Sequence, residues 1–177
     1  MKTTLKDIRE SYESLGGKKV CVSGWVRTIR DSKSFAFIEI NDGTFFKNTQ
    51  VIIDESLDNY KDIVKLNVGA AISVEGELVL TPNMQQPYEI RAGKVCIEAT
   101  STPNYPLQKK RHSLEFLREI AHLRPRTNTF LAVFKVRSVA AQAIHAFFAE
   151  RNFVYVNTPL ITTSDCEGAG EMFRVTT

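Results

Sequence analysis

The hydrophobic pattern of residues 20–53 alternates with a period of two and predicts three short strands that pair in sequence. The second strand is the most informative because its two faces differ in character. Its aliphatic positions are Ala36, Ile38 and Ile40, and its opposite positions are Phe35, Phe37, Glu39 and Asn41. We therefore expect the aliphatic face to fill a core and the other face to meet solvent.

The flanking pattern extends this sheet to a small barrel. Helical spacing predicts helices over residues 4–15 and 55–66, and the first helix has Thr4 and Asp7 placed as a capping box. Residues 71–80 read as a fourth strand with a bend at Gly76, and residues 88–91 and 94–99 read as an interrupted fifth strand. Three strands, a helix and two strands are the order of the five-stranded OB-fold barrel.

The pattern changes after residue 100. Two prolines in residues 101–106 indicate a domain boundary, and helices are expected over 111–123 and from Thr127 or Asn128 to about Arg151. The longer helix has too much apolar surface to stay in water, so it needs a partner within the chain or across a dimer. Strands are expected at 153–156 and from Met172.

Composition adds weak constraints on function. The 177 residues carry a net charge of +3 with a pI of about 8.8, which is compatible with a nucleic-acid partner. We find no apolar run long enough for a bilayer and no secretory signal, and the three cysteines fit no zinc pattern. These features favour a cytoplasmic protein with free thiols and no membrane association.

Two features are candidates for nucleic-acid binding. Phe35 and Phe37 lie on the polar face near Arg30 and other basic residues, and such a face can stack bases and neutralise phosphate. Ordinary cross-strand packing explains the same phenylalanines. The basic cluster at 107–112, LQKKRH, is either a solvated linker or a phosphate contact. His145 beside the apolar stripe of the long helix is more typical of packing than of a ligand.

Three strings resemble the N-terminal portion of class II aminoacyl-tRNA synthetases of the aspartyl, asparaginyl and lysyl subgroup. They are GWVRTIRDSKSFAFIEINDG at 24–43, FKVRSVAAQAIHAFFAERNFVYVNTPLIT at 134–162 and SDCEGAGEMFRV at 164–175. The third string is close to the asparaginyl form of the loop that enters the amino-acid pocket. The resemblance implies an OB-fold anticodon-binding domain at 1–100, a hinge at 101–126, and at 127–177 the incomplete start of an α+β catalytic domain built on an antiparallel sheet.

The resemblance also implies roles for individual residues of the barrel. Phe37 would stack on the central anticodon base, which is a uridine throughout the subgroup. Gln50 and Arg30 would form hydrogen bonds with that base, and Glu89 would read the first anticodon base. Stacking tolerates any base, so polar groups on the base edges must supply the discrimination.

In the catalytic part, Glu167 would meet the α-ammonium of asparagine and Gly168 would allow close backbone approach; both could instead be ordinary loop residues. Neither a catalytic residue nor a metal site is expected in this segment. The helix and strand that end at Pro159 would form a homodimer interface. Its expected residues are Phe134, Ile144, Phe148 and Pro159.

The implied activity is ATP-dependent activation of asparagine, with Mg²⁺, and its transfer to tRNA(Asn). The second and third family motifs, which would hold ATP, do not occur in the sequence, so we expect the 177-residue chain to be inactive by itself. Other readings are an aspartate ligase, a non-catalytic OB-fold protein that binds single-stranded nucleic acid, and a synthetase paralogue without its catalytic half.

Overall fold

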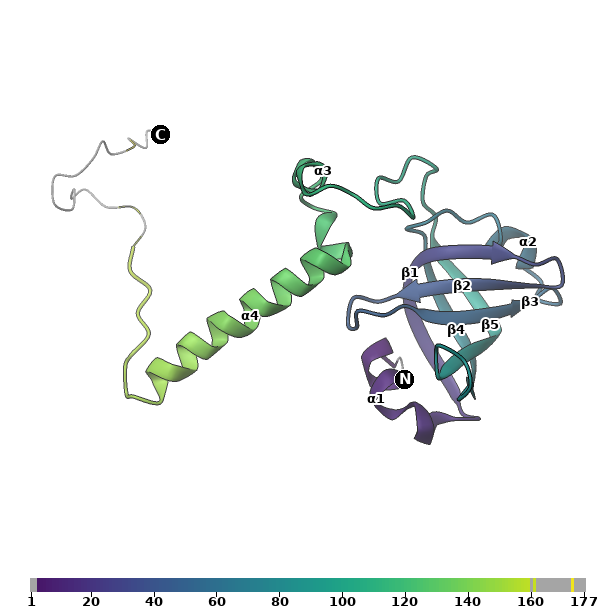
Figure 1. Ribbon diagram of the computed structural model, residues 1–177, viewed down its shortest axis with the longest axis horizontal. Helices are drawn as coiled ribbons and strands as arrows, with labels where there is room; N and C mark the ends of the chain where they lie inside the picture. Colours follow the sequence, from purple (N-terminus) through teal and green to yellow (C-terminus); the bar gives the residue numbers. More distant parts are fainter. Residues whose placement is uncertain (1–2, 160, 162–172, 174–177) are drawn as a thin grey trace. The chain divides into compact units, whose positions relative to one another are not determined.

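The computed structural model describes residues 3–159, 161 and 173, and it forms two compact units, residues 1–134 and 135–177. The expected sites at Glu167 and Gly168 and the expected strand from Met172 lie outside the described residues. The first unit contains every strand in the described part of the chain (Figure 1).

The first unit is built around a closed five-stranded barrel. Its strands are β1 (Lys19–Asp31), β2 (Phe35–Asn41), β3 (Thr49–Asp54), β4 (Ala71–Leu80) and β5 (Tyr88–Ala99). The order around the barrel is β1-β2-β3-β5-β4, and every pair is antiparallel except β3 with β5. The OB-fold prediction is confirmed. The break expected in the last strand is wrong, because β5 is continuous; its register with β4 shifts between Glu75 and Gly76 instead.

The barrel interior is filled by the aliphatic face that the alternation predicted. Ala36, Ile38 and Ile40 are completely buried, whereas Phe35 on the opposite face of β2 is 39% exposed. The interior also contains aliphatic residues of the other four strands. Burial of this apolar surface is the main stabilising contribution to the barrel and fixes which face of each strand points outward.

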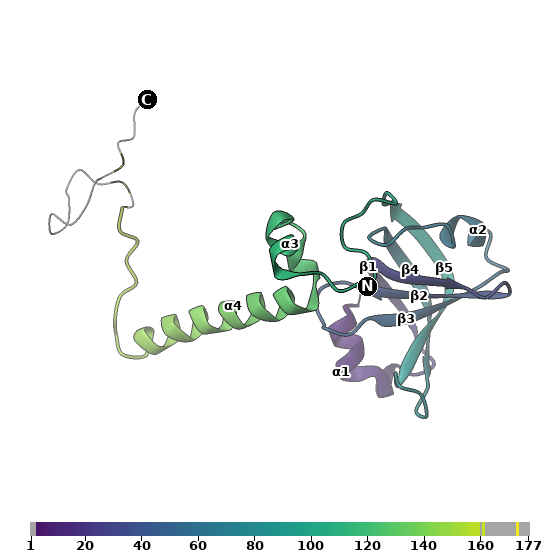
Figure 2. The same ribbon diagram turned by 45° about the horizontal axis from the view of Figure 1, so that its top comes forward.

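Helix α1 (Leu5–Leu15) packs its Leu5 and Ile8 side chains into the barrel core. The predicted capping box is present, and the Thr4 hydroxyl at 2.6 Å lowers the pKa of the Asp7 carboxyl. The Asp42 carboxylate after β2 accepts a hydrogen bond of 2.8 Å from the Leu5 amide. This bond ties the start of α1 to the β2–β3 connection, and Figure 2 shows the two side by side.

Helix α2 (Tyr60–Ile63) is much shorter than the predicted helix at 55–66. The Asp54 side chain accepts the Ser56 amide at 3.0 Å and the Asp54 carbonyl accepts the Leu57 amide at 3.2 Å, so residues 55–59 form turns instead. Asparagine and aspartate side chains compete with the helical backbone in this way. The Tyr60 hydroxyl donates to Asp31 at 2.8 Å and thereby connects α2 to the end of β1.

The segment between the barrel and the long helix is held against the barrel. The Arg126 guanidinium lies 4.4 Å from the ring centroid of Trp25 and donates a hydrogen bond of 3.0 Å to the Tyr105 hydroxyl. Arg27 donates to the Arg126 carbonyl at 3.2 Å. Helix α3 (Leu114–Glu119) covers only part of the predicted 111–123, and the 3-10 helix η1 (Arg124–Arg126) follows it.

Helix α4 (Asn128–Ala149) begins in the first unit and continues into the second. The Phe130 amide donates to the Thr127 hydroxyl at 3.4 Å, so Thr127 is the capping residue. By length and composition alone α4 could cross a membrane, which corrects the expectation that no apolar run is long enough. The predicted strand at 153–156 is also wrong: these residues are extended and exposed, and in the described part of the chain no strand pairs with them.

Candidate nucleic-acid interface

Four strands present a continuous outer surface on one side of the barrel. The register places Arg30 of β1 opposite Phe37 of β2, and Phe37 opposite Ile52 of β3. Ile52 in turn pairs with Arg91 of β5. Residues that face one another in adjacent strands share a side of the sheet, so Phe37 lies in a row with an arginine at each end.

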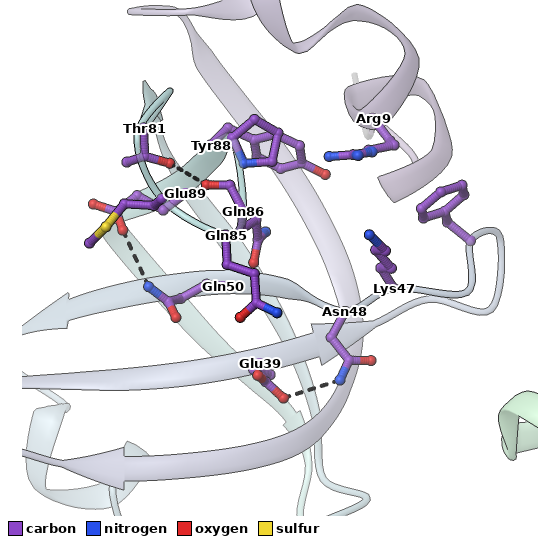
Figure 3. A pocket seen from close by; sticks show the side chains of 13 residues that line it. Arg9, Glu39, Lys47, Asn48, Gln50, Thr81, Gln85, Gln86, Tyr88 and Glu89 are labelled. Carbon is purple, nitrogen blue, oxygen red and sulfur yellow. Dashed lines mark hydrogen bonds between the residues drawn. The ribbon is translucent and has the colours of Figure 1, made fainter.

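A second row lies two residues along the same strands. Glu39 of β2 is opposite Gln50 of β3. The Gln50 amide donates to the Glu89 carboxylate of β5 at 3.3 Å, and the Asn48 amide donates to Glu39 at 3.1 Å (Figure 3). Gln50 therefore sits between two carboxylates, and its carbonyl oxygen has no partner among the described residues.

Phe37 of the aromatic pair on β2 is the ring that we consider for base stacking. Phe35 and Phe37 meet edge to face, with ring centroids 5.1 Å apart and an interplanar angle of 84°. Phe35 is exposed and Phe37 is half-buried. Edge-to-face contact is a preferred geometry for two aromatic rings and holds the Phe37 ring in one orientation. An ordered ring on a wet sheet face is what base stacking requires.

A cavity of about 380 Å³ opens beside the second row. It is lined by Gln50 and Glu89, by Arg9 of α1, and by residues of the β2–β3 and β4–β5 connections (Figure 3). The β4–β5 connection is fixed by the Thr81 hydroxyl, which donates to the Gln86 carbonyl at 2.6 Å. In Figure 3 the side chains of Gln85 and Gln86 point into this space.

The cavity contains the donors and acceptors that a nucleobase edge needs. Carboxylates accept hydrogen bonds from base imino and amino groups, and amides both donate and accept. Unstacked bases of single-stranded RNA are recognised through such contacts on their Watson–Crick edges. The arrangement can therefore stack one base on Phe37 and hold the edge of a base at Gln50 and Glu89.

The structure brings together the four residues that the sequence predicted for base recognition. Arg30 and Phe37 are direct cross-strand partners, and Gln50 and Glu89 are joined by a hydrogen bond. The predicted interface residues Ile144, Phe148 and Pro159 are exposed, and Phe134 is half-buried. Within residues 3–159, 161 and 173 no cluster of His, Cys, Asp and Glu could hold a metal.

Sequence reasoning missed the residues that close the cavity. Arg9 was only part of a predicted helix, and Phe45, Lys47 and Asn48 were assigned no role. Arg9 follows the buried Ile8 directly, so it stands at the edge of the apolar stripe. The position of Arg9 at the edge of this stripe is the one sequence feature that could have indicated that its side chain lies near the barrel.

Comparison with known proteins gives two family matches that divide the chain. Residues 20–97 match a family described as OB-fold nucleic acid binding domain, and residues 113–177 match tRNA synthetases class II (D, K and N). The first match covers the barrel strands, and the second begins at the cap of α3.

The chain is similar over nearly its whole length to proteins named asparagine--tRNA ligase. The protein of Clostridium kluyveri is 62% identical over 99% of this chain, and that of Clostridium acetobutylicum is 65% identical over 98%. The chain spans only 38% and 37% of the length of these relatives.

A solved structure has the same fold. The asparaginyl-tRNA synthetase of Pyrococcus horikoshii complexed with asparaginyl-adenylate matches with a TM-score of 0.83 and 22% identity. The match covers 96% of this chain and 39% of that one.

Proposed function

Since this chain belongs to the asparaginyl-tRNA synthetase family, we propose that it supplies the anticodon-reading part of an asparagine--tRNA ligase. The observation that carries the proposal is the juxtaposition of Phe37 with the hydrogen-bonded pair of Gln50 and Glu89 on one face of the barrel. A stacked uridine on Phe37 would have its edge near the amide of Gln50. The carboxylate of Glu89 would accept from the imino and amino groups of a guanine.

Arg30 completes the proposed site from β1. Its side chain is exposed and stands directly opposite Phe37. A guanidinium at this position donates hydrogen bonds to a base or phosphate held over the ring. Arg30 does not line the cavity, so we assign it to the central base and assign Glu89 to the neighbouring one.

The complete reaction would be ATP-dependent activation of asparagine and its transfer to tRNA(Asn), with Mg²⁺ at the phosphates. We assign Glu167 and Gly168 to the asparagine pocket from the sequence resemblance alone. The exposed apolar residues of α4, among them Ile144 and Phe148, support a role for this helix as a homodimer interface. We place the reaction in the cytoplasm with no membrane involved.

The test is binding of three anticodon stem-loops, GUU, GUC and UUU, at two salt concentrations. We expect tightest binding to GUU at both. Weaker binding with an unchanged preference at high salt would separate base recognition from phosphate attraction. Equal binding of all three would contradict the proposal and favour a generic single-strand binder; preference for GUC would favour the aspartate reading.

A further inference from the structure

The cavity has a cationic side that base recognition does not use. Arg9 of α1 and Lys47 of the β2–β3 connection both line it, and Figure 3 shows the two side chains near each other, across the cavity from Glu89. Arg9 is half-buried and Lys47 is exposed. Neither forms an ion pair with a carboxylate in the described part of the chain.

The Arg9 guanidinium lies near a stack of two tyrosine rings. Its central carbon lies 5.9 Å from the ring centroid of Tyr12, and Tyr12 stacks on Tyr88 with centroids 5.5 Å apart. Burial raises the pKa of the Tyr88 phenol, and the positive charge of Arg9 opposes that rise. Tyr88 also lines the cavity, so the charge of Arg9 is directed at the cavity wall.

We propose that Arg9 and Lys47 form a subsite for a backbone phosphate of the anticodon loop. The inference rests on the proposed function, because it takes the occupant to be RNA. A nucleotide with its base at Gln50 and Glu89 has its own phosphate or its neighbour's within one nucleotide length, and two cations without a protein carboxylate partner suit a phosphate there. The two carboxylates and the two cations occupy different parts of the cavity, so base edge and phosphate are not in competition.

A purely structural role for Arg9 is the alternative. Its aliphatic stem and its contact with Tyr12 could serve packing alone. The substitution Arg9→Met retains most of the packing and removes the charge, whereas Arg9→Lys retains the charge. Lys94→Gln is the matched control, because Lys94 is an exposed lysine of β5 outside the cavity.

The experiment measures stem-loop binding against salt for the wild type, the Arg9→Met/Lys47→Gln double variant and Lys94→Gln. Each phosphate of a single strand that the protein no longer neutralises reduces the slope of log K against log salt by about 0.7. We expect the slope of the double variant to be smaller by about 0.7, and its binding of GUU, GUC and UUU to weaken by one common factor. The single variant Arg9→Lys retains both charges and should keep a slope close to that of the wild type. Thermal melting confirms that each variant is folded.

A second arm identifies the phosphate. Stem-loops with one uncharged methylphosphonate linkage in the anticodon loop are bound to the same proteins. At one position the modification should weaken the wild type and Lys94→Gln but leave the double variant unchanged, because that protein no longer has the cations that bind the phosphate. The phosphate subsite would be overturned if the double variant had the same salt slope as Lys94→Gln and if no methylphosphonate position distinguished the double variant from the wild type. Absence of a GUU preference in the wild type would instead overturn the proposed function, and the methylphosphonate result would still decide the subsite.

Discussion

Gln50 of β3 donates from Nε2 to Oε2 of Glu89 on β5, over 3.3 Å. The bond connects two strands that pair in parallel through only two register positions, Val51 with Ile90 and Ile52 with Arg91. An ionised carboxylate has about four lone-pair sites, so both oxygens of Glu89 can still accept a hydrogen bond from a ligand. The same bond holds the Gln50 amide in one orientation, so that it presents its carbonyl oxygen to the cavity.

Replacement of Glu89 by glutamine should change specificity more than affinity. The carboxylate accepts two hydrogen bonds from a guanine edge, whereas an amide accepts at only one of its two atoms. We expect the preference for G over A at the first anticodon position to fall by about 1–3 kcal/mol, the usual cost of an unmatched buried polar group. The measurement compares GUU and AUU stem-loops. An unchanged ratio would contradict the assignment of Glu89 to this base.

Phe37→Ala should weaken every stem-loop. Removal of one stacking ring costs about 1–3 kcal/mol and does not depend on the base. Phe35→Ala is the control. Phe35 contacts the Phe37 ring edge to face, but it stands at the first residue of β2. We expect the smaller loss of affinity for Phe35→Ala, measured by titration of the GUU stem-loop. A larger loss for Phe35→Ala would move the stacking platform to that ring.

The hydrogen bond between Tyr60 and Asp31 should make stability depend on pH at both extremes. Burial and the Asp31 contact raise the pKa of Tyr60 to about 12, and the Tyr60 hydroxyl lowers the pKa of Asp31 below its usual value of 3.8. A raised tyrosine pKa gives stability below the unfolded value of about 10 that is lost as pH rises toward 12. A lowered aspartate pKa gives stability above about 4 that is lost as pH falls further.

Tyr60→Phe measures this contribution directly. The free energy of unfolding should differ between wild type and variant by a constant amount between about pH 5 and 9, and the difference should shrink outside that range. Asp31→Asn should remove the acidic decline. Denaturant melts from about pH 3 to 11 provide the data. A difference that stays constant at the alkaline end would mean that the raised pKa of Tyr60 has no part in folding.

Gly76→Ala should destabilise the barrel, because a Cβ there would collide with the carbonyl oxygen of Arg91 where the β4–β5 register shifts. The carbonyl belongs to the neighbouring strand and cannot move without disturbing the pairing. We expect a loss of about 1–3 kcal/mol in the free energy of unfolding, measured by denaturant melts. Gly93→Ala is the matched control, because its Cβ would lie 3.8 Å from the Glu75 carbonyl oxygen, an ordinary contact. Equal melts for the two variants would contradict the steric argument.

Arg126→Ala should release the segment between the barrel and α4. The side chain contacts Trp25 through its guanidinium and donates to the Tyr105 hydroxyl. The variant can form neither interaction, while the barrel core contains neither Trp25 nor Tyr105. We therefore expect faster proteolysis and faster amide exchange at 101–127 with an unchanged melting temperature of the barrel. Equal protection in wild type and variant would show that Arg126 does not hold the segment.

The sequence by itself determined the barrel and the face that carries Phe37. Period-two alternation is a local property, and the requirement to bury Ile38 and Ile40 fixes the opposite face without knowledge of the partner strands. It also located the capping box at Thr4 and the irregularity at Gly76, because each is signalled by residues close together in the chain.

Only the tertiary structure decided which residues form the cavity. Arg9, Lys47 and Glu89 are far apart in the chain, and no periodicity relates them; the closure of the barrel brings them together.

Predictions from local sequence patterns failed where an interaction with a distant part of the chain decides the secondary structure. Residues 153–156 have a strand pattern but no neighbouring strand in the described part of the chain, and a strand without a partner has no hydrogen bonds to hold it. The helix expected at 55–66 shrank to four residues, because the Asp54 side chain and the Tyr60–Asp31 contact are specific interactions that hydrophobic spacing does not record.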